Sequence, residues 1–488
     1  MLEYRRDLNF YCLMTILPVL ALLAAALPSA NLPFTVTATE DVSSQFPGAP
    51  RIQSFSFAQW KGRWVFIGGR IAGYHSVGGG SADFLRADAN RDVWVVDTTV
   101  HPAKTYHVPL NTLPASHAPI KDQWAATAQL YSQDGQSLYI AGGYGEDHNG
   151  KWLTFPVISQ VDLPRLIDGV MHGRLPAEAI AFTKTPLVQS AGGVLSKLPG
   201  GDFYLVMGHS FNGAYTAFEG HEEHNTNAVS QDYLNEIRKL KIARGADGGL
   251  TVTLLEKFQD PTEFHRRDLN VTQILSPKGL GLAAYGGVFT PETQLNYSKP
   301  VYVFPNSRPV IDADFDQNMN AYLCPTMLLY DKPAATMYTT FFGGISRHSW
   351  DSATGKFVEY PKTGSKTEAT YLDGLQWSDQ ISTIRKVMTP GHELTTEMVQ
   401  TELLPAWIGA DAVFIPVPEL ARAHAGTDIL DMEPLRGSRV QVGYIYGGIR
   451  AFPYRFPYDK TAMPYNAGTV PTKPSTFILK VYLQVPNP

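Results

Sequence analysis

The strongest constraint on the fold is one short pattern that recurs six times along the chain: an apolar strand that ends in a pair of glycines. The copies occupy residues 64–69, 139–143, 204–208, 282–287, 340–344 and 444–448. The third copy departs from the pattern, because Met207 stands where the first glycine is expected. A unit that recurs in this way cannot bury its apolar faces alone, so the pattern predicts repeats packed side by side.

The surroundings of each glycine pair also recur. A second apolar strand and a tight polar turn precede the pair, and a strand that often opens with Asn or Asp follows it, most clearly at Asp92–Asp97. A fourth strand is predicted at Lys104–Leu110 and again at Leu250–Phe258. Four short strands joined by tight connections predict one antiparallel sheet in each repeat. The composition agrees, since 44% of the residues are hydrophobic and only 17% are charged.

The glycine pair followed by an Asn- or Asp-led aromatic strand resembles the kelch repeat. The resemblance extends over about residues 33–488. It implies an all-β fold, a six-bladed kelch-type β-propeller with four-stranded antiparallel blades. The expected single domain is 31–488, with blades at about 50–110, 122–187, 190–260, 266–316, 320–402 and 408–488. The last blade lacks a fourth strand, and we expect the N-terminal strand within 33–40 to complete it and to close the ring.

The N-terminus has the features of an export signal. Arg5 and Arg6 precede a short apolar run at residues 16–27, and small residues follow it. The run has the length of a signal-peptide core, so residues 1–30 are predicted to be a signal peptide, with a retained N-terminal anchor as the alternative. The predicted location is therefore secreted, extracellular or periplasmic, with no transmembrane span beyond this segment.

Charge and cysteine content restrict the partners. The net charge of -5 does not indicate the basic surface that nucleic-acid binding requires. Cys12 lies in the predicted signal segment, which leaves Cys324 as the one thiol of the mature chain. The chain has no phosphate-cradling loop, serine-nucleophile elbow or zinc ribbon.

The resemblance places the loops after the glycine pairs on one face, together with the segments that join successive blades. These long loops are where a ligand is expected to bind on a rigid scaffold. The predicted ligand-binding residues are Arg70, His75, Trp124, His209, Arg266, Arg267, Asn320, Arg347 and Arg450. Arginine forks can hold an anionic ligand, but surface arginines paired with neighbouring carboxylates are the plainer alternative.

One loop carries a cluster of histidines. His221 and His224 lie three residues apart beside two glutamates, and His209 precedes them. Imidazoles and carboxylates are ligands for divalent metals, so these three histidines form a candidate metal site, with a solvated loop as the alternative. No other cofactor is expected.

Three functions remain open. The first is a secreted propeller that binds a protein, peptide or glycan on its loop face without turnover. The second is a sugar-processing enzyme resembling the six-bladed sialic acid epimerases, in which arginines and carboxylates would move a proton. The third is a copper-radical oxidase resembling galactose oxidase, for which Cys324 next to Pro325 is the sole matching feature, and a buried structural cysteine is the alternative there.

Overall fold

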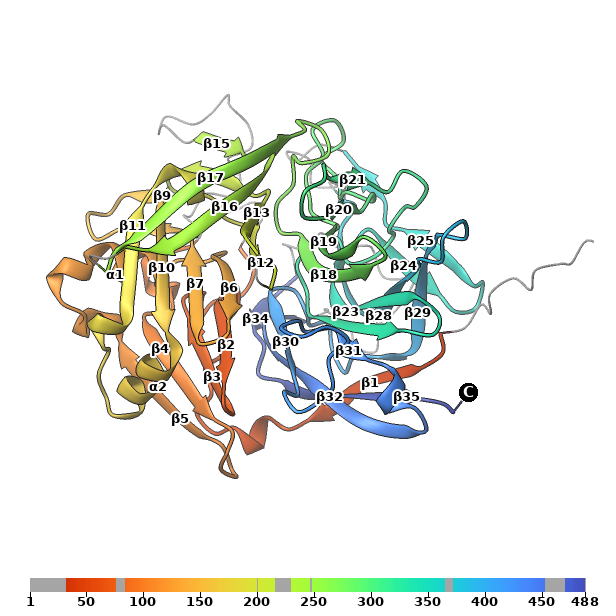
Figure 1. The fold of residues 1–488 in the computed structure, drawn as a ribbon, viewed down its shortest axis with the longest axis horizontal. Helices are drawn as coiled ribbons and strands as arrows, with labels where there is room; N and C mark the ends of the chain where they lie inside the picture. The colour runs from red at the N-terminus through yellow and green to blue at the C-terminus, as the bar shows by residue number, and fades with distance from the viewer. Residues whose placement is uncertain are drawn as a thin grey trace, which may run out of the picture.

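The computed structural model describes residues 32–75, 84–199, 201–215, 230–245, 248–364, 372–452 and 470–487. The predicted signal peptide, at residues 1–30, lies outside these residues. Within them the chain is mostly strands, with two α-helices, α1 (Ala118–Gln123) and α2 (Leu163–Met171) (Figure 1). No helix in the described ranges is long and apolar enough to cross a membrane.

Six sheets each contain one copy of the glycine-pair pattern, and we number them in chain order. The first holds β2 (Ser56–Trp60), β3 (Arg63–Ile67), β4 (Asp92–Asp97) and β5 (Lys104–Pro109); the second holds β6 (Leu130–Asp134), β7 (Ser137–Ala141), β10 (Val157–Asp162) and β11 (Ile180–Lys184). The third holds β12 (Val194–Lys197), β13 (Phe203–Val206), β16 (Glu236–Arg244) and β17 (Leu250–Gln259); the fourth holds β18 (Asn270–Ser276), β19 (Gly279–Tyr285), β20 (Val301–Val303) and β21 (Val310–Ile311).

The last two sheets depart from strict chain order. The fifth holds β22 (Thr326–Asp331), β23 (Thr336–Ser346), β28 (Gln376–Val387), β29 (Leu394–Leu403) and, from a later part of the chain, β31 (Leu430–Asp431). The sixth holds β30 (Ala412–Pro416), β32 (Ser438–Gly447), β35 (Ile478–Val485) and β1 (Thr35–Asp41). β1 pairs antiparallel with β35, so the first and last strands of the described chain lie in one sheet. Several four-stranded antiparallel sheets in a chain of this composition fit an all-β propeller.

The long loops also contain short strands that the sequence pattern did not predict. β8 (Tyr144–Glu146), β9 (Trp152–Thr154), β14 (His209–Asn212) and β15 (Ser230–Tyr233) form a further four-stranded sheet. The two-stranded pairs are β24 (His348–Asp351) with β25 (Lys356–Glu359), β26 (Lys362–Thr363) with β27 (Leu372–Asp373), and β33 (Ile449–Ala451) with β34 (Thr472–Pro474). These pairings satisfy backbone groups in segments that would otherwise be irregular.

Every glycine pair has the backbone conformation expected of it. Both members have positive φ in all six copies, and Met207 takes φ 58° where the third copy lacks its glycine. Space is equally restricted: a Cβ at Gly142 would lie 1.9 Å from the carbonyl oxygen of Ser190, in the segment that leads into β12 of the next sheet. The pair therefore lets each second strand turn where two sheets meet.

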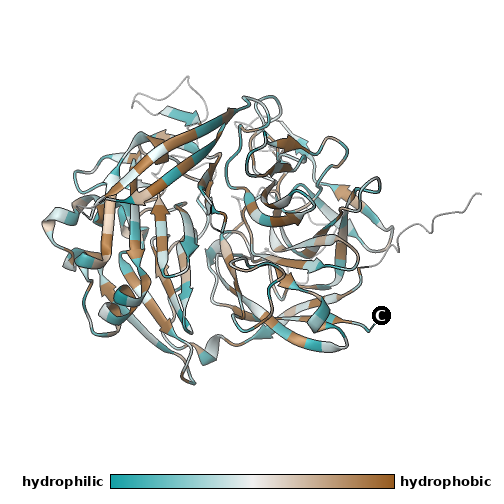
Figure 2. Ribbon diagram, viewed as in Figure 1, coloured by the Kyte–Doolittle hydropathy of each residue, from teal (hydrophilic) through white to brown (hydrophobic). Residues whose placement is uncertain are grey.

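The apolar residues of neighbouring sheets pack against each other. Figure 2 shows that the strands carry most of the hydrophobic residues and that the connecting loops are largely hydrophilic. Buried clusters span adjacent sheets; one of them joins Val65 and Val95 of the first sheet to Ile140 and Val161 of the second. Burial of side chains between sheets is the main source of stability for such an arrangement.

Candidate functional site

Six backbone hydrogen bonds link the segments that lead into the innermost strands. The donors and acceptors are Ser54 N to Asp411 O (3.4 Å), Asp411 N to Leu323 O (3.0 Å), Leu323 N to Asp268 O (2.7 Å), Asp268 N to Gly192 O (2.6 Å), Gly192 N to Ala128 O (3.2 Å) and Ala128 N to Ser54 O (3.2 Å). The sixth bond returns to the residue from which the first started, so these residues form a closed amide cycle. All except Leu323 have φ between 51° and 65°, which turns each amide toward the carbonyl of a neighbouring segment.

A cavity of about 1100 Å³ lies on one side of the amide cycle. All six residues of the cycle line it, and β2, β6, β12, β18, β22 and β30, one from each sheet, form its walls. In Figure 1 the labelled members of this set lie around the middle of the molecule. The turn residues Gly62, Gly135 and Pro199, which follow innermost strands, also line the cavity. We call this space the axial cavity; the amide cycle is its floor, and these turns are at its mouth.

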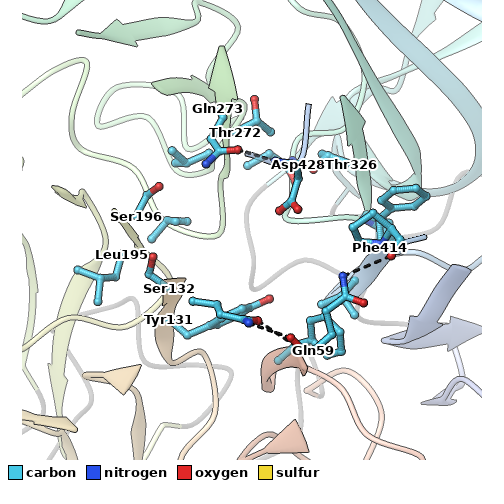
Figure 3. Close-up of a pocket in the computed structure, with 18 of the residues that line it drawn as sticks. Gln59, Tyr131, Ser132, Leu195, Ser196, Thr272, Gln273, Thr326, Phe414 and Asp428 are labelled. Atoms are coloured by element: carbon cyan, nitrogen blue, oxygen red, sulfur yellow. Dashed lines mark hydrogen bonds between the residues drawn. The ribbon is translucent and has the colours of Figure 1, made fainter. Parts of the chain in front are cut away.

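The walls of the axial cavity combine polar and apolar surface in similar amounts. Amide and hydroxyl side chains project from several strands, and Figure 3 shows Tyr131, Ser132 and Ser196 across the cavity from Gln273, Asp428 and Phe414. The polar lining includes Gln59, Ser132, Gln133, Ser196, Thr272, Gln273 and Thr326, and the aromatic lining includes Phe57, Trp60, Tyr131 and Phe414. Such a wall offers both hydrogen-bond donors and acceptors and flat apolar faces to a ligand.

Side-chain hydrogen bonds hold neighbouring innermost strands together. The Gln59 backbone N–H donates to Gln133 Oε1 (3.0 Å), and Gln133 Nε2 donates to the Gln59 carbonyl (2.8 Å). Gln59 Nε2 donates to the Pro416 carbonyl (3.3 Å), and the Lys197 backbone N–H donates to Ser132 Oγ (3.0 Å). These bonds fix the side chains that face the cavity, so the wall is preorganised.

Two carboxylates lie at the floor of the axial cavity. Burial, together with the nearby charge of Asp268, raises the pKa of Asp411 to about 7, although a hydrogen bond from Ser54 and the charge of Arg70 oppose the shift. Burial also raises the pKa of Asp268, against the attraction of Arg267, whose Nη1 lies 3.5 Å from Asp268 Oδ2. Burial and the charge of Asp268 thus both favour the protonated form of Asp411.

The other side of the amide cycle, toward the loops after the glycine pairs, holds a cluster of aromatic and charged side chains. Tyr74 and Tyr322 share a hydrogen bond, and burial raises the pKa of both phenols. Arg267 lies 4.9 Å from the ring centre of Phe289. Burial, helped by the charge of Arg267, lowers the pKa of His209 well below its usual range, so His209 is neutral at physiological pH.

Some of the predicted ligand-binding residues meet on this loop side. His75 stacks on Tyr74 with ring centres 4.2 Å apart, and Gln231 Nε2 lies 2.9 Å from His209 Nδ1. The guanidinium of Arg70 lies 4.3 Å from the Phe84 ring centre, beside a smaller cavity of about 290 Å³. Arg450 packs between Phe452 and Phe477, at 4.6 Å and 4.8 Å from the two ring centres. None of His75, His209, Arg267 and Arg450 lines the axial cavity.

Other predicted residues belong to the interior instead. Trp124, Arg266 and Asn320 are each 0% exposed. Trp124 Nε1 donates to Ser159 Oγ (3.0 Å), Arg266 donates to Glu263 (2.6 Å), and Asn320 Nδ2 donates to the Gly343 carbonyl (2.8 Å). These three side chains lie in the interior of this structure and are held by contacts within the chain, so the structure does not place them on the loop surface where the sequence predicted them.

Arg347 is also bound within the chain. It is 7% exposed, donates to the Gly374 carbonyl (3.0 Å), and pairs with Glu359 and the Tyr360 carbonyl. The guanidinium of Arg347 thus links the end of β23 to the segments that follow it. Pairing within the chain is the alternative to ligand binding that the sequence left open for such arginines.

The candidate metal site cannot be assembled from the described residues. His221 and His224 lie outside them, and His209 contacts Gln231 and Tyr233. Within the described ranges, no three His, Cys, Asp or Glu side chains are grouped as metal ligands would be. Cys324 is buried, and burial raises the pKa of its thiol to about 12.

The residues that make the axial cavity were not predicted from the sequence. Asp411 and Gln273 stand in segments without any recognisable motif. Only their position along the sequence could have indicated these residues: each residue of the amide cycle lies within three residues of the start of an innermost strand.

Comparisons with known proteins add little. No family model matches the chain, and no curated protein matches it. Among solved structures, the chain is similar to the one titled "Structure of YjhT", with 10% sequence identity and a TM-score of 0.44, over 84% of this chain and 98% of that one. A likeness at this level carries no argument about function.

Proposed function

We propose that this chain is a six-bladed kelch-type propeller, closed by β1, that binds a carbohydrate in its axial cavity. The observation that carries the proposal is the cavity itself, of about 1100 Å³, with an innermost strand from each of six sheets in its wall. Pairing of β1 with β35 and the closed amide cycle support the ring. As part of the proposal, the N-terminal apolar run directs export.

The chemistry of the wall supports a sugar as the ligand. Hydroxyl and amide groups such as Ser196, Gln273 and Thr326 match the many hydroxyls of a sugar, and Tyr131 and Phe414 offer faces for its apolar side. The volume of about 1100 Å³ slightly exceeds the roughly 300–1000 Å³ typical of small-molecule sites, which leaves room for more than one sugar ring. A folded protein partner is too large to use this space.

The charges at the floor narrow the class of sugar. The charged lining residues at the floor are Asp268 and Asp411, whereas the basic residues of the lining, Lys61, Lys197 and Arg422, lie in or beside the turns and the segment at the mouth. The carboxylate of an acidic sugar would be repelled by these acidic groups at the floor. We therefore favour a neutral or amino sugar over the sialic acid class.

Acid–base chemistry on the bound sugar is the second candidate function. The observation that favours it is the pair of carboxyl groups at the floor, of which Asp411 has a pKa raised by burial to about 7. A carboxyl group with a pKa near the working pH can both donate and accept a proton. In this version Asp411 transfers the proton. The charge of Asp268, which itself lies beside Arg267, helps to raise the pKa of Asp411.

The test is a screen of neutral, amino and acidic oligosaccharides on a glycan array, followed by calorimetry with the best ligand. Tyr131→Ala should weaken binding by about 1–3 kcal/mol, or roughly 5- to 150-fold, through loss of an aromatic face. Arg450→Ala, on the loop side, is the matched control and should bind like the wild type. If Arg450→Ala abolishes binding and Tyr131→Ala does not, the loop face is the site and the proposal fails.

The enzymatic version needs a separate measurement. The bound sugar is incubated with the protein and followed by proton NMR for a change at the anomeric carbon or for bond cleavage. Asp411→Asn should abolish any such conversion and leave binding within about tenfold, because the variant keeps the shape of the side chain. A ligand that binds and remains unchanged identifies a binding protein.

A further inference from the structure

The segment between β30 and β32 leaves the sixth sheet and crosses to others. Its strand β31 pairs in parallel with β22, so that Leu430 lies opposite Leu329 of the fifth sheet. Beyond β22, the Asp428 backbone N–H donates to Gln273 Oε1 (3.0 Å) in the fourth sheet. Gly426 reaches Pro199, which follows the innermost strand of the third sheet. One segment thus touches three sheets besides its own.

Residues 421–431 form a small hairpin, which we call the crossing hairpin. Ala423 N donates to the Ile429 carbonyl (2.9 Å), and Asp431 N donates to the Ala421 carbonyl (3.0 Å). At the turn, Thr427 Oγ1 donates to the His424 carbonyl (2.7 Å). These bonds lie within the hairpin and join its two arms to each other.

The two ends of the crossing hairpin differ in how they are held. At the base, Ile429, Leu430 and Met432 are each 0% exposed, and Met432 N donates to the Tyr330 carbonyl (3.0 Å). At the tip, residues 424–426 and 428 are exposed. The tip reaches across the cavity through the Asp428–Gln273 hydrogen bond and the approach of Gly426 to Pro199. A buried base and an exposed, weakly held tip are the features of a hinged segment.

The crossing hairpin stands at the mouth of the axial cavity. Arg422, Gly426, Thr427 and Asp428 all line the cavity, and so does Pro199 opposite the tip. Figure 3 shows Asp428 joined to Gln273 by a hydrogen bond at the edge of the open space. Any ligand that enters past this edge must pass the tip.

We propose that the crossing hairpin is a gate, whose tip at residues 424–428 swings away from Gln273 and Pro199 to admit a ligand and then returns. The base at β31 is the hinge, and the tip moves as one piece because its hydrogen bonds are internal. Opening breaks the Asp428–Gln273 hydrogen bond and the contact of Gly426 with Pro199, and it uncovers Thr427, which is buried in this structure. These losses are few, so both states are accessible at room temperature. The proposal builds on the cavity as the binding site, but its test needs no ligand.

A disulfide can lock the tip in place. A Cβ at Gly426 would lie 3.4 Å from Pro199 Cβ, close to the separation of about 3.5–4.5 Å found in disulfides. The test protein carries Gly426→Cys and Pro199→Cys to form the disulfide, and Ser132→Cys to place a reporter thiol in the cavity wall. Labelling of the reporter thiol by iodoacetamide is followed by peptide mass mapping, with the disulfide locked and after reduction.

Locking should slow the labelling of the reporter thiol by about tenfold or more, because the reagent must then avoid the closed mouth. The matched control carries Pro199→Cys and Ser132→Cys alone, and oxidising conditions should leave its labelling rate unchanged. Equal rates in the locked and reduced forms would overturn the gate. That result would leave the sugar-binding proposal standing, so the two proposals fail separately.

A second measurement uses the unaltered chain, in case the triple variant does not fold. By hydrogen exchange, the amides of residues 425–428 should exchange at least about tenfold faster than those of 429–432, since only the tip opens. Gln273→Ala should accelerate exchange at Asp428 further. Tip amides that exchange as slowly as those of β31 would show a fixed wall instead of a gate.

Discussion

The backbone N–H of Asp268 donates a 2.6 Å hydrogen bond to the Gly192 carbonyl, and the Asp268 side chain lies over the same glycine. A Cβ at Gly192 would lie 2.6 Å from Asp268 Oδ1. One contact therefore closes part of the amide cycle and fixes a carboxylate at the floor of the axial cavity. The position leaves no room for a side chain, and φ is +65° there.

Gly192→Ala should lower the free energy of unfolding by about 2–4 kcal/mol, through backbone strain and the clash with Asp268. Urea denaturation gives the value. Gly135→Ala is the control, because Gly135 also has positive φ but a Cβ added there would have nothing within 4 Å. The control should lose only about 1–2 kcal/mol, the cost of the left-handed conformation. Equal losses would mean that the Asp268 contact does not matter for stability.

Asp411 should make the stability of the protein depend on pH. Burial raises the pKa of Asp411 to about 7 in the folded state, whereas an unfolded aspartate has a pKa of about 3.9. Between these values the folded state binds one more proton, so the contribution of Asp411 to stability is fully present below the unfolded pKa and is lost as the pH rises to about 7.

Asp411→Asn removes this titration, so the variant should gain stability over the wild type as the pH rises from about 4 to about 7, and the gain should then level off. Denaturant unfolding measured across this range provides the check. Asp314→Asn, at an exposed aspartate, is the matched change of charge. A constant difference between Asp411→Asn and the wild type at every pH would contradict the prediction.

The N-terminal strand should contribute strongly to stability. Val36 of β1 is 0% exposed and packs among residues of the fifth and sixth sheets. Val36→Asp places a charge there and should lower the free energy of unfolding by about 3–5 kcal/mol. The neighbouring Thr35 is exposed, so Thr35→Asp is the control and should change stability by less than about 0.5 kcal/mol. Similar melting temperatures for the two variants would show that β1 adds little to the sheet.

Trp124 should behave as a structural residue. Its indole N–H donates to Ser159 Oγ at 3.0 Å inside the core. Trp124→Phe should destabilise the fold by about 1–3 kcal/mol through loss of this hydrogen bond and of packing. A double-mutant cycle with Ser159→Ala measures the hydrogen bond itself. Loss of sugar binding by Trp124→Phe without loss of stability would return Trp124 to the ligand site.

The recurring elements were predictable from the sequence because their causes are local. Alternation of apolar residues predicted strands such as β4, whose bounds Asp92–Asp97 agree with the expectation. The glycine pairs predicted turns with positive φ, and every pair has it. β6 begins at Leu130, two residues after Ala128, whose φ of 51° lets it join the amide cycle. At this point the hydrogen bond from Ala128 to Ser54, a residue just before the first sheet, decides the backbone conformation, and local strand propensity does not.

The geometry of the candidate site, by contrast, depends on contacts between distant parts of the chain. Ser54 meets Asp411 in the amide cycle, and Asp428 meets Gln273 at the cavity mouth. No local pattern marks such pairs, since each residue looks ordinary beside its own neighbours. The strands, the turns and the repeat that unites them follow from the order of the amino acids alone, because backbone conformation and alternation act over a few residues. Which polar residues face a common space follows only from the folded chain, because it depends on how six sheets pack around that space.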